Sequence, residues 1–100
     1  MEHFLSIPKV NDGIEVEIKD TYDFGKGSYY FGEWKKDISN GKLVRHGRGI
    51  YHFGSDGNKA GCSYISQILM DGFHGEVKMI YDDGKVNKAI FEKGELIKWL

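Results

Sequence analysis

The sequence predicts an all-β fold in which consecutive antiparallel hairpins are joined into one sheet. Three observations support this prediction. The chain has 14 glycines, one proline and only two alanines, although alanine is the strongest helix former. Residues typical of strands are abundant, with ten Ile, five Val, six Tyr, six Phe and two Trp. Several segments alternate apolar and polar side chains, which is the pattern of a strand with one buried face.

Asx-Gly pairs mark the expected turns, because a type I′ hairpin turn needs two consecutive residues with positive φ. The chain contains five of these pairs: Asp12-Gly13, Asn40-Gly41, Asp56-Gly57, Asp71-Gly72 and Asp83-Gly84. Pairs at this density indicate a string of hairpins.

The expected strands follow in order. IEVEIK, at residues 14–19, alternates strictly and is expected to form a half-buried strand. Further strands are expected at Ser28–Lys35, Ile50–Phe53, Ser63–Leu69, Glu76–Tyr81 and Lys85–Glu92. Asp37–Arg45 is expected to be an exposed loop or extended turn around Asn40-Gly41. Glu95–Leu100 fits either a strand or a short helix, with strand favoured.

Length and charge limit the functions that the chain can have. One hundred residues predict a single domain, residues 1–100. The net charge of −1 gives no basic excess of the kind that binds nucleic acid, so no nucleic-acid partner is expected. The single cysteine, Cys62, excludes an internal disulfide. The first residues lack a signal-peptide pattern and no apolar run is long enough to span a membrane, which predicts a cytoplasmic protein.

Residue types recur in the same order along the chain. A first copy, at roughly 30–57, has Tyr30-x-Gly32-x-Trp34 followed by HGRGIYHF at His46–Phe53. A second, at roughly 64–84, has Tyr64, then His74-Gly75, and closes at Asp83-Gly84. A third covers roughly 87–100, and residues 1–29 are expected to form N-terminal capping strands.

This order resembles the MORN repeat family, whose unit is a β-hairpin of about 23 residues reading Y-x-G-x-W-x-x-G, then G-x-G and D-G. The second copy departs from that pattern at Ser66, Ile68 and Val77. The resemblance implies a short, irregular sheet of about two and a half stacked hairpin repeats. It also implies an adaptor or assembly element of membrane junctions, cytoskeletal structures or cilia, with protein or phospholipid partners.

No catalytic, cofactor or metal site is predicted. His46 and His74 occupy the same place in two copies, so repetition explains them without a metal or an acid–base role. A zinc site needs further ligands, and Cys62 is the only soft candidate. The glycine pairs Gly25-x-Gly27 and Gly47-x-Gly49 do not extend to a phosphate-binding fingerprint.

Two groups of side chains are candidates for contact with a partner. The first consists of aromatic residues that the repeat pattern does not require: Tyr22, Tyr29, Phe31 and Phe73. The second is a local basic patch, which is either a charged loop or a site for an anionic partner such as acidic protein or phospholipid. Its members are Lys35, Lys36, Lys42, Arg45 and Arg48.

The favoured hypothesis is a non-enzymatic interaction or assembly module that binds a partner protein through an aromatic-rich hairpin face. One alternative is a small inhibitor or immunity-type protein that blocks a larger enzyme. Another is a peripheral element that binds phospholipid weakly through the basic patch. A homo-oligomer is a further alternative, because Glu95–Leu100 would offer an unpaired strand edge.

Overall fold

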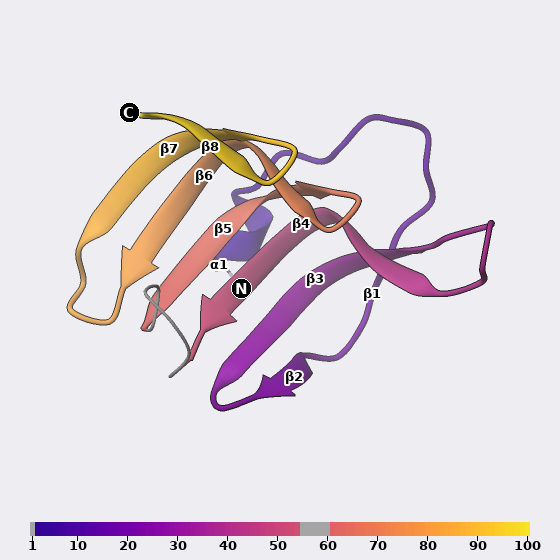
Figure 1. Ribbon diagram of the computed structural model, residues 1–100, viewed down its shortest axis with the longest axis horizontal. Helices are drawn as coiled ribbons and strands as arrows, with labels where there is room; N and C mark the ends of the chain where they lie inside the picture. Colours follow the sequence, from indigo (N-terminus) through magenta and orange to yellow (C-terminus); the bar gives the residue numbers. More distant parts are fainter. Residues whose placement is uncertain (1, 55–60) are drawn as a thin grey trace.

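The computed structural model describes residues 2–54 and 61–100, and eight strands in these residues form one antiparallel sheet (Figure 1). The predicted all-β class is therefore confirmed. A single helical turn, α1 (Glu2–Leu5), precedes the strands. The strands are β1 (Glu17–Ile18), β2 (Tyr22–Gly25), β3 (Ser28–Lys36), β4 (Leu43–Phe53), β5 (Cys62–Leu69), β6 (Gly72–Tyr81), β7 (Val86–Glu92) and β8 (Glu95–Trp99).

The strands from β3 to β8 form a meander, in which each strand pairs with the next one along the chain. The predicted consecutive hairpins are thus confirmed. The two short strands β1 and β2 share the outer edge of β3, where β1 pairs with Glu33 and Trp34 and β2 pairs near Tyr30 (Figure 1). Of the capping strands expected in residues 1–29, only β1 and β2 form.

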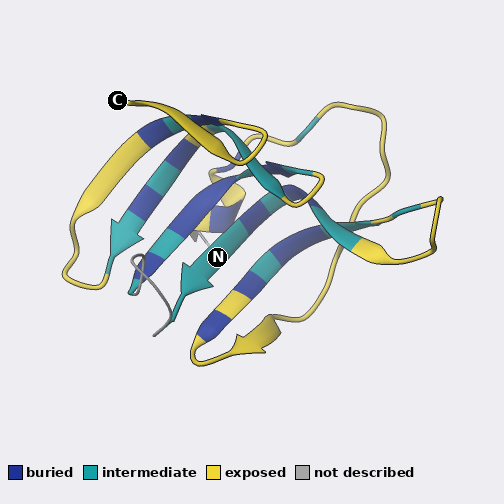
Figure 2. Ribbon diagram, in the orientation of Figure 1, coloured by how far each residue is buried: buried dark blue, intermediate teal, exposed yellow. Residues whose placement is uncertain are grey.

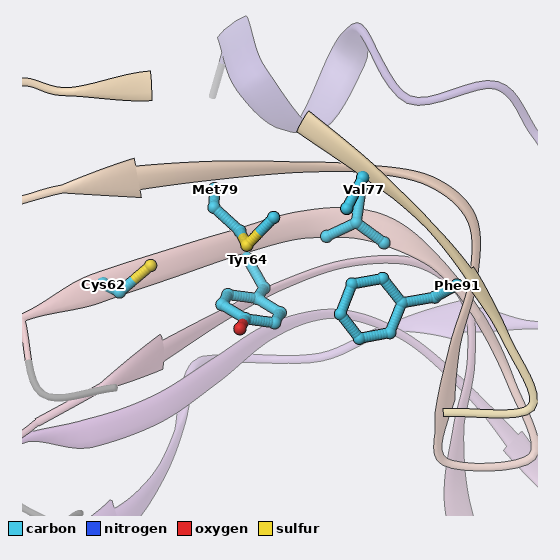
Figure 3. Close-up of a cluster of buried hydrophobic side chains, with 6 residues drawn as sticks. Cys62, Tyr64, Val77, Met79 and Phe91 are labelled. Atoms are coloured by element: carbon cyan, nitrogen blue, oxygen red, sulfur yellow. The ribbon is translucent and has the colours of Figure 1, made fainter. Parts of the chain in front are cut away.

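The sheet has two faces because successive side chains of a strand point in opposite directions. One, the aromatic face, carries Tyr30, Tyr51 and Tyr64, which the strand register places opposite one another across β3, β4 and β5. Its core includes Tyr64, Met79 and Phe91, with the rings of Tyr64 and Phe91 5.9 Å apart (Figure 3). The shared face follows from the alternation of side chains along these strands.

The other face, the helix face, is covered by α1, which Figure 1 shows behind the sheet. Phe4 is only 1% exposed, and Ile7 is also buried. The Phe4 ring meets Phe31 at 5.3 Å, and the Arg48 guanidinium lies 4.7 Å from its centre. The N-terminal segment therefore closes the core on this side, and Figure 2 shows buried residues in β3–β7, whereas β1, β2 and β8 are exposed.

The fully buried Tyr30 ring lies across two glycines, Gly32 of β3 and Gly49 of β4. A Cβ on Gly49 would stand 2.5 Å from the ring, and a Cβ on Gly32 would meet the carbonyl oxygen of Arg48. The Tyr30 hydroxyl donates a hydrogen bond of 2.8 Å to the Glu33 carbonyl. Only glycine fits at both positions.

Two successive hairpins reproduce each other in their hydrogen bonds. The amide of Asp71, in the β5–β6 turn, donates to the carbonyl of Arg45 at 2.9 Å. The amide of Gly94, in the β7–β8 turn, donates to the carbonyl of Phe73 at 3.0 Å. The two donors are 23 residues apart and the two acceptors are 28 residues apart.

The Asx-Gly pairs do not all form the turns expected of them. Asn40-Gly41 and Asp83-Gly84 do lie between paired strands. In the β5–β6 hairpin the turn residues are instead Met70 and Asp71, both with positive φ. Gly72 is already a strand residue and pairs with Leu69. Its backbone packs against Gly94, and a Cβ on Gly72 would come within 3.1 Å of the amide nitrogen of Gly94.

The two remaining pairs form no observed hairpin. Asp12-Gly13 is a bend that joins no strands, so that turn prediction is wrong. Asp56-Gly57 lies outside the described residues.

Two expected segments also differ from the structure, and a third agrees with it. The half-buried strand at 14–19 is wrong, since β1 has only two residues and both are exposed. β1 shares this edge of β3 with β2, which pairs with residues 28–30, and β1 itself pairs only with Glu33 and Trp34. The loop expected over Asp37–Arg45 ends earlier, because β4 begins at Leu43 and pairs with Lys36. Glu95–Trp99 is a strand.

Replacing Gly49 by alanine is expected to lower the free energy of unfolding by about 1–3 kcal/mol, because the new methyl group overlaps the Tyr30 ring. Urea unfolding measures this change. In a Tyr30→Leu background, where the ring is absent, the same replacement is expected to cost less. An equal cost in both backgrounds would show that the ring does not set the requirement for glycine.

Candidate functional site

The predicted basic patch is divided between the two faces of the sheet. Lys35, Lys36 and Lys42 lie at the end of the β3–β4 hairpin. Arg45 and Arg48, three residues apart in β4, have different neighbours. Arg45 lies among the rings of the aromatic face, whereas Arg48 lies against Phe4 on the helix face.

Arg48 forms a largely buried ion pair with Glu33. Its Nε and Nη2 donate to the two carboxylate oxygens at 3.0 and 3.1 Å, and its amide donates to Oε1 at 2.8 Å. Burial alone would raise the pKa of the Glu33 carboxyl, but the hydrogen bonds from Arg48 outweigh it and the pKa is lowered. Arg48 is thus engaged inside the fold and is removed from the anionic-partner patch.

Arg45 lies over a group of aromatic rings. Its guanidinium carbon is 5.4 Å from the centre of the Tyr51 ring and 5.8 Å from those of Phe24 and Tyr30. Its Nε donates to Oδ1 of Asp71 at 3.0 Å, and its amide donates to the same oxygen at 2.9 Å. The β5–β6 turn and the rings together hold this guanidinium in one place.

Beside Arg45 is an open pocket of about 390 Å³, called here the Arg45 pocket. This volume is within the range of about 300–1,000 Å³ that is common for ligand sites. Tyr22 and Phe24, which form part of its wall, are 53% and 48% exposed. The residues that line it are Lys19, Asp20, Tyr22, Phe24, Trp34, Leu43, Arg45 and Asp71.

The four aromatic candidates are not brought together. Tyr22 lines the Arg45 pocket, with its ring 4.7 Å from Phe24 and 5.9 Å from Trp34. Tyr29 is exposed on the helix face and stacks on His52 at 5.0 Å. The other two candidates are half-buried, Phe31 beneath α1 and Phe73 against the core of the aromatic face.

The sequence therefore identified two residues of this pocket, Tyr22 in its wall and Arg45 as its cation. It missed Phe24 and Asp71 as parts of the same site. The i, i+2 spacing of Tyr22 and Phe24 is a signal for a shared strand face. Nothing local joins Asp71 to Arg45, because they are 26 residues apart and meet only when the β5–β6 hairpin forms.

His46 is fully occupied by two hydrogen bonds. Its Nδ1 accepts from the amide of Met70 at 3.1 Å, and its Nε2 is 2.6 Å from Oδ2 of Asp12. An acceptor role at Nδ1 fixes the proton on Nε2, which donates to Asp12. A general base needs a ring nitrogen open to substrate, and His46 has none. The bond instead fixes the N-terminal segment onto the sheet.

The equivalent histidine, His74, lacks this arrangement, and its buried Nδ1 has no hydrogen-bond partner within the described part of the chain. In residues 2–54 and 61–100, no three His, Cys, Asp or Glu side chains lie together as metal ligands would. Cys62 is buried in the core beside Tyr64.

Comparisons with family models, curated proteins and solved structures give no match to this chain. Within the described residues, no helix has the length and apolar character needed to cross a membrane. The Arg45 pocket is therefore interpreted from its own chemistry.

The Asp12–His46 bond makes stability depend on pH. The hydrogen bond from His46 lowers the pKa of the Asp12 carboxyl below its ordinary value of 3.8. A lowered pKa in the folded state contributes stability above the unfolded value, and that contribution is lost as the pH falls through the folded value. Urea unfolding is expected to show a steeper loss of stability between about pH 5 and about pH 3 in the native chain than in Asp12→Asn. Equal slopes would contradict this role of Asp12.

Cys62 is expected to react with a water-soluble thiol reagent only when the chain unfolds, because it is 1% exposed. Labelling followed by mass spectrometry, without and with denaturant, measures this. Rapid stoichiometric labelling of the native chain would contradict the burial of Cys62.

Proposed function

We propose that this protein is a non-enzymatic binding module that contacts a partner protein through the Arg45-pocket end of its aromatic face. The observation that carries this proposal is the pocket wall itself. Tyr22 and Phe24 are each about half exposed although their rings contact each other. Exposed aromatic side chains beside a positioned arginine are typical of the residues that dominate binding energy at protein interfaces.

The surroundings of the pocket support the same function. Asp71 and the rings hold Arg45 before any partner arrives, so little side-chain freedom remains to be lost on binding. The exposed Lys36 and Lys42 stand next to Leu43, which lines the pocket. A polar, charged rim around an aromatic centre is the usual anatomy of an interface.

Two tyrosines of the β2–β3 hairpin provide a matched test. Tyr22 lines the pocket, whereas Tyr29 is exposed on the opposite face. The tagged chain is used to capture partners from an extract of the source cells, and recovery is quantified by mass spectrometry. Tyr22→Ala is expected to reduce partner recovery about tenfold or more, and Tyr29→Ala to leave it unchanged. Thermal unfolding of both variants checks that they remain folded.

Loss of the partner only in Tyr29→Ala would move the contact to the helix face and refute the proposed surface. Recovery of only the chain itself would refute a separate protein partner and favour a homo-oligomer. The captured protein also separates the two forms of the proposal. A single enzyme in stoichiometric amount identifies an inhibitor, whereas several structural proteins identify an assembly module.

A further inference from the structure

The guanidinium of Arg45 is only partly used within the fold. Nε bonds to Asp71, but the two terminal nitrogens, Nη1 and Nη2, make no hydrogen bond to any described residue. These nitrogens carry four N–H donors in the plane that pairs best with a carboxylate. The side chain is 24% exposed and lines the pocket, so the unused donors are accessible from solvent.

A second donor of the pocket wall also lacks an acceptor. The indole Nε1 of Trp34 is buried and has no hydrogen-bond partner among the residues that the structure describes. Buried donors without acceptors are rare in folded proteins and carry a cost in free energy. The unused donors of Arg45 therefore favour a ligand that supplies acceptor oxygens.

We propose that the Arg45 pocket binds an acidic side chain of a partner polypeptide next to an apolar one, so that the carboxylate pairs with Nη1 and Nη2 of Arg45 and the apolar side chain packs on Tyr22 and Phe24. This inference rests on the proposed function and names the chemistry that the same site recognises. In this arrangement the apolar side chain covers the two exposed rings and the carboxylate accepts from the unused donors of Arg45.

The charges of the lining favour a peptide carboxylate over a phosphate or a membrane surface. Lys19 and Arg45 are balanced there by Asp20 and Asp71. A doubly charged phosphate or a sheet of anionic headgroups would be repelled by these two carboxylates. A single carboxylate placed end-on against Arg45 gains two directional, charge-assisted hydrogen bonds at a smaller cost.

The two tryptophan indole N–H signals of the ¹⁵N-labelled full chain report on opposite ends of the sheet. Trp34 lines the pocket, whereas Trp99 lies in β8. The probe is N-acetyl-phenylalanyl-glutamate amide, and the matched control is the glutamine analogue. The glutamate probe is expected to shift the Trp34 signal saturably and about tenfold more tightly than the glutamine analogue, with Trp99 unmoved. Inorganic phosphate and glycerophosphoserine, a lipid headgroup, are titrated in parallel.

Two variants with opposite expected effects test the role of the guanidinium. Arg45→Lys keeps the charge but loses the planar pair of donors, and is expected to weaken the glutamate probe about tenfold without changing the glutamine analogue. Asp71→Asn keeps an acceptor oxygen for Nε of Arg45 but removes the negative charge beside the pocket, and is expected to tighten the glutamate probe. Lys78→Gln, on the helix face, is the control and is expected to change neither. The position of the Trp99 signal checks the fold of each variant.

Equal binding of the glutamate and glutamine probes, or no shift at Trp34, would overturn the inference. Saturation of the Trp34 shift by phosphate or glycerophosphoserine at a lower concentration than by the glutamate probe would also overturn it. The site would then be one for free phosphate or for a lipid headgroup. A captured partner that depends on Tyr22 but is unaffected by Arg45→Lys would refute the carboxylate contact and leave the binding function standing.

Discussion

The rest of the structure depends on the Tyr30 ring lying flat across Gly32 and Gly49. The two glycines let β3 and β4 approach under the ring, and burial raises the pKa of the Tyr30 hydroxyl, which keeps its proton and donates it to the Glu33 carbonyl. In the next hairpin Ser66 and Val77 take the places of the glycines and fill that space with side chains.

Strand β4 carries two arginines with different roles, one structural and one a candidate for function. Arg48 is paired with Glu33 and lies against Phe4, so it joins the N-terminal segment to the sheet. Arg45 is paired at one nitrogen only, and its remaining donors face an open pocket. The two arginines differ in how far they are removed from water. A largely buried cation needs protein acceptors for its donors, whereas a partly exposed cation can use water.

Patterns local in sequence predicted most of the sheet. Alternation located β3, β5, β6 and β7, because a strand with one buried face must repeat every two residues. It failed at residues 14–19, where the pattern is strict but the edge of β3 is already shared with β2. The β5–β6 turn lies one residue earlier than the Asp71-Gly72 pair predicts, and Gly72 is in the strand, in contact with Gly94 of the neighbouring hairpin.

The sequence by itself determined the fold class, the order of hairpins and which side chains share the aromatic face, because these follow from turn chemistry and a period of two. Only the tertiary structure decided which candidates form a site. It placed Asp71 on Arg45 across 26 residues, separated Tyr22 from Tyr29 and put Phe31 beneath α1. Pairing between distant strands and the covering of a face depend on contacts that no local pattern encodes.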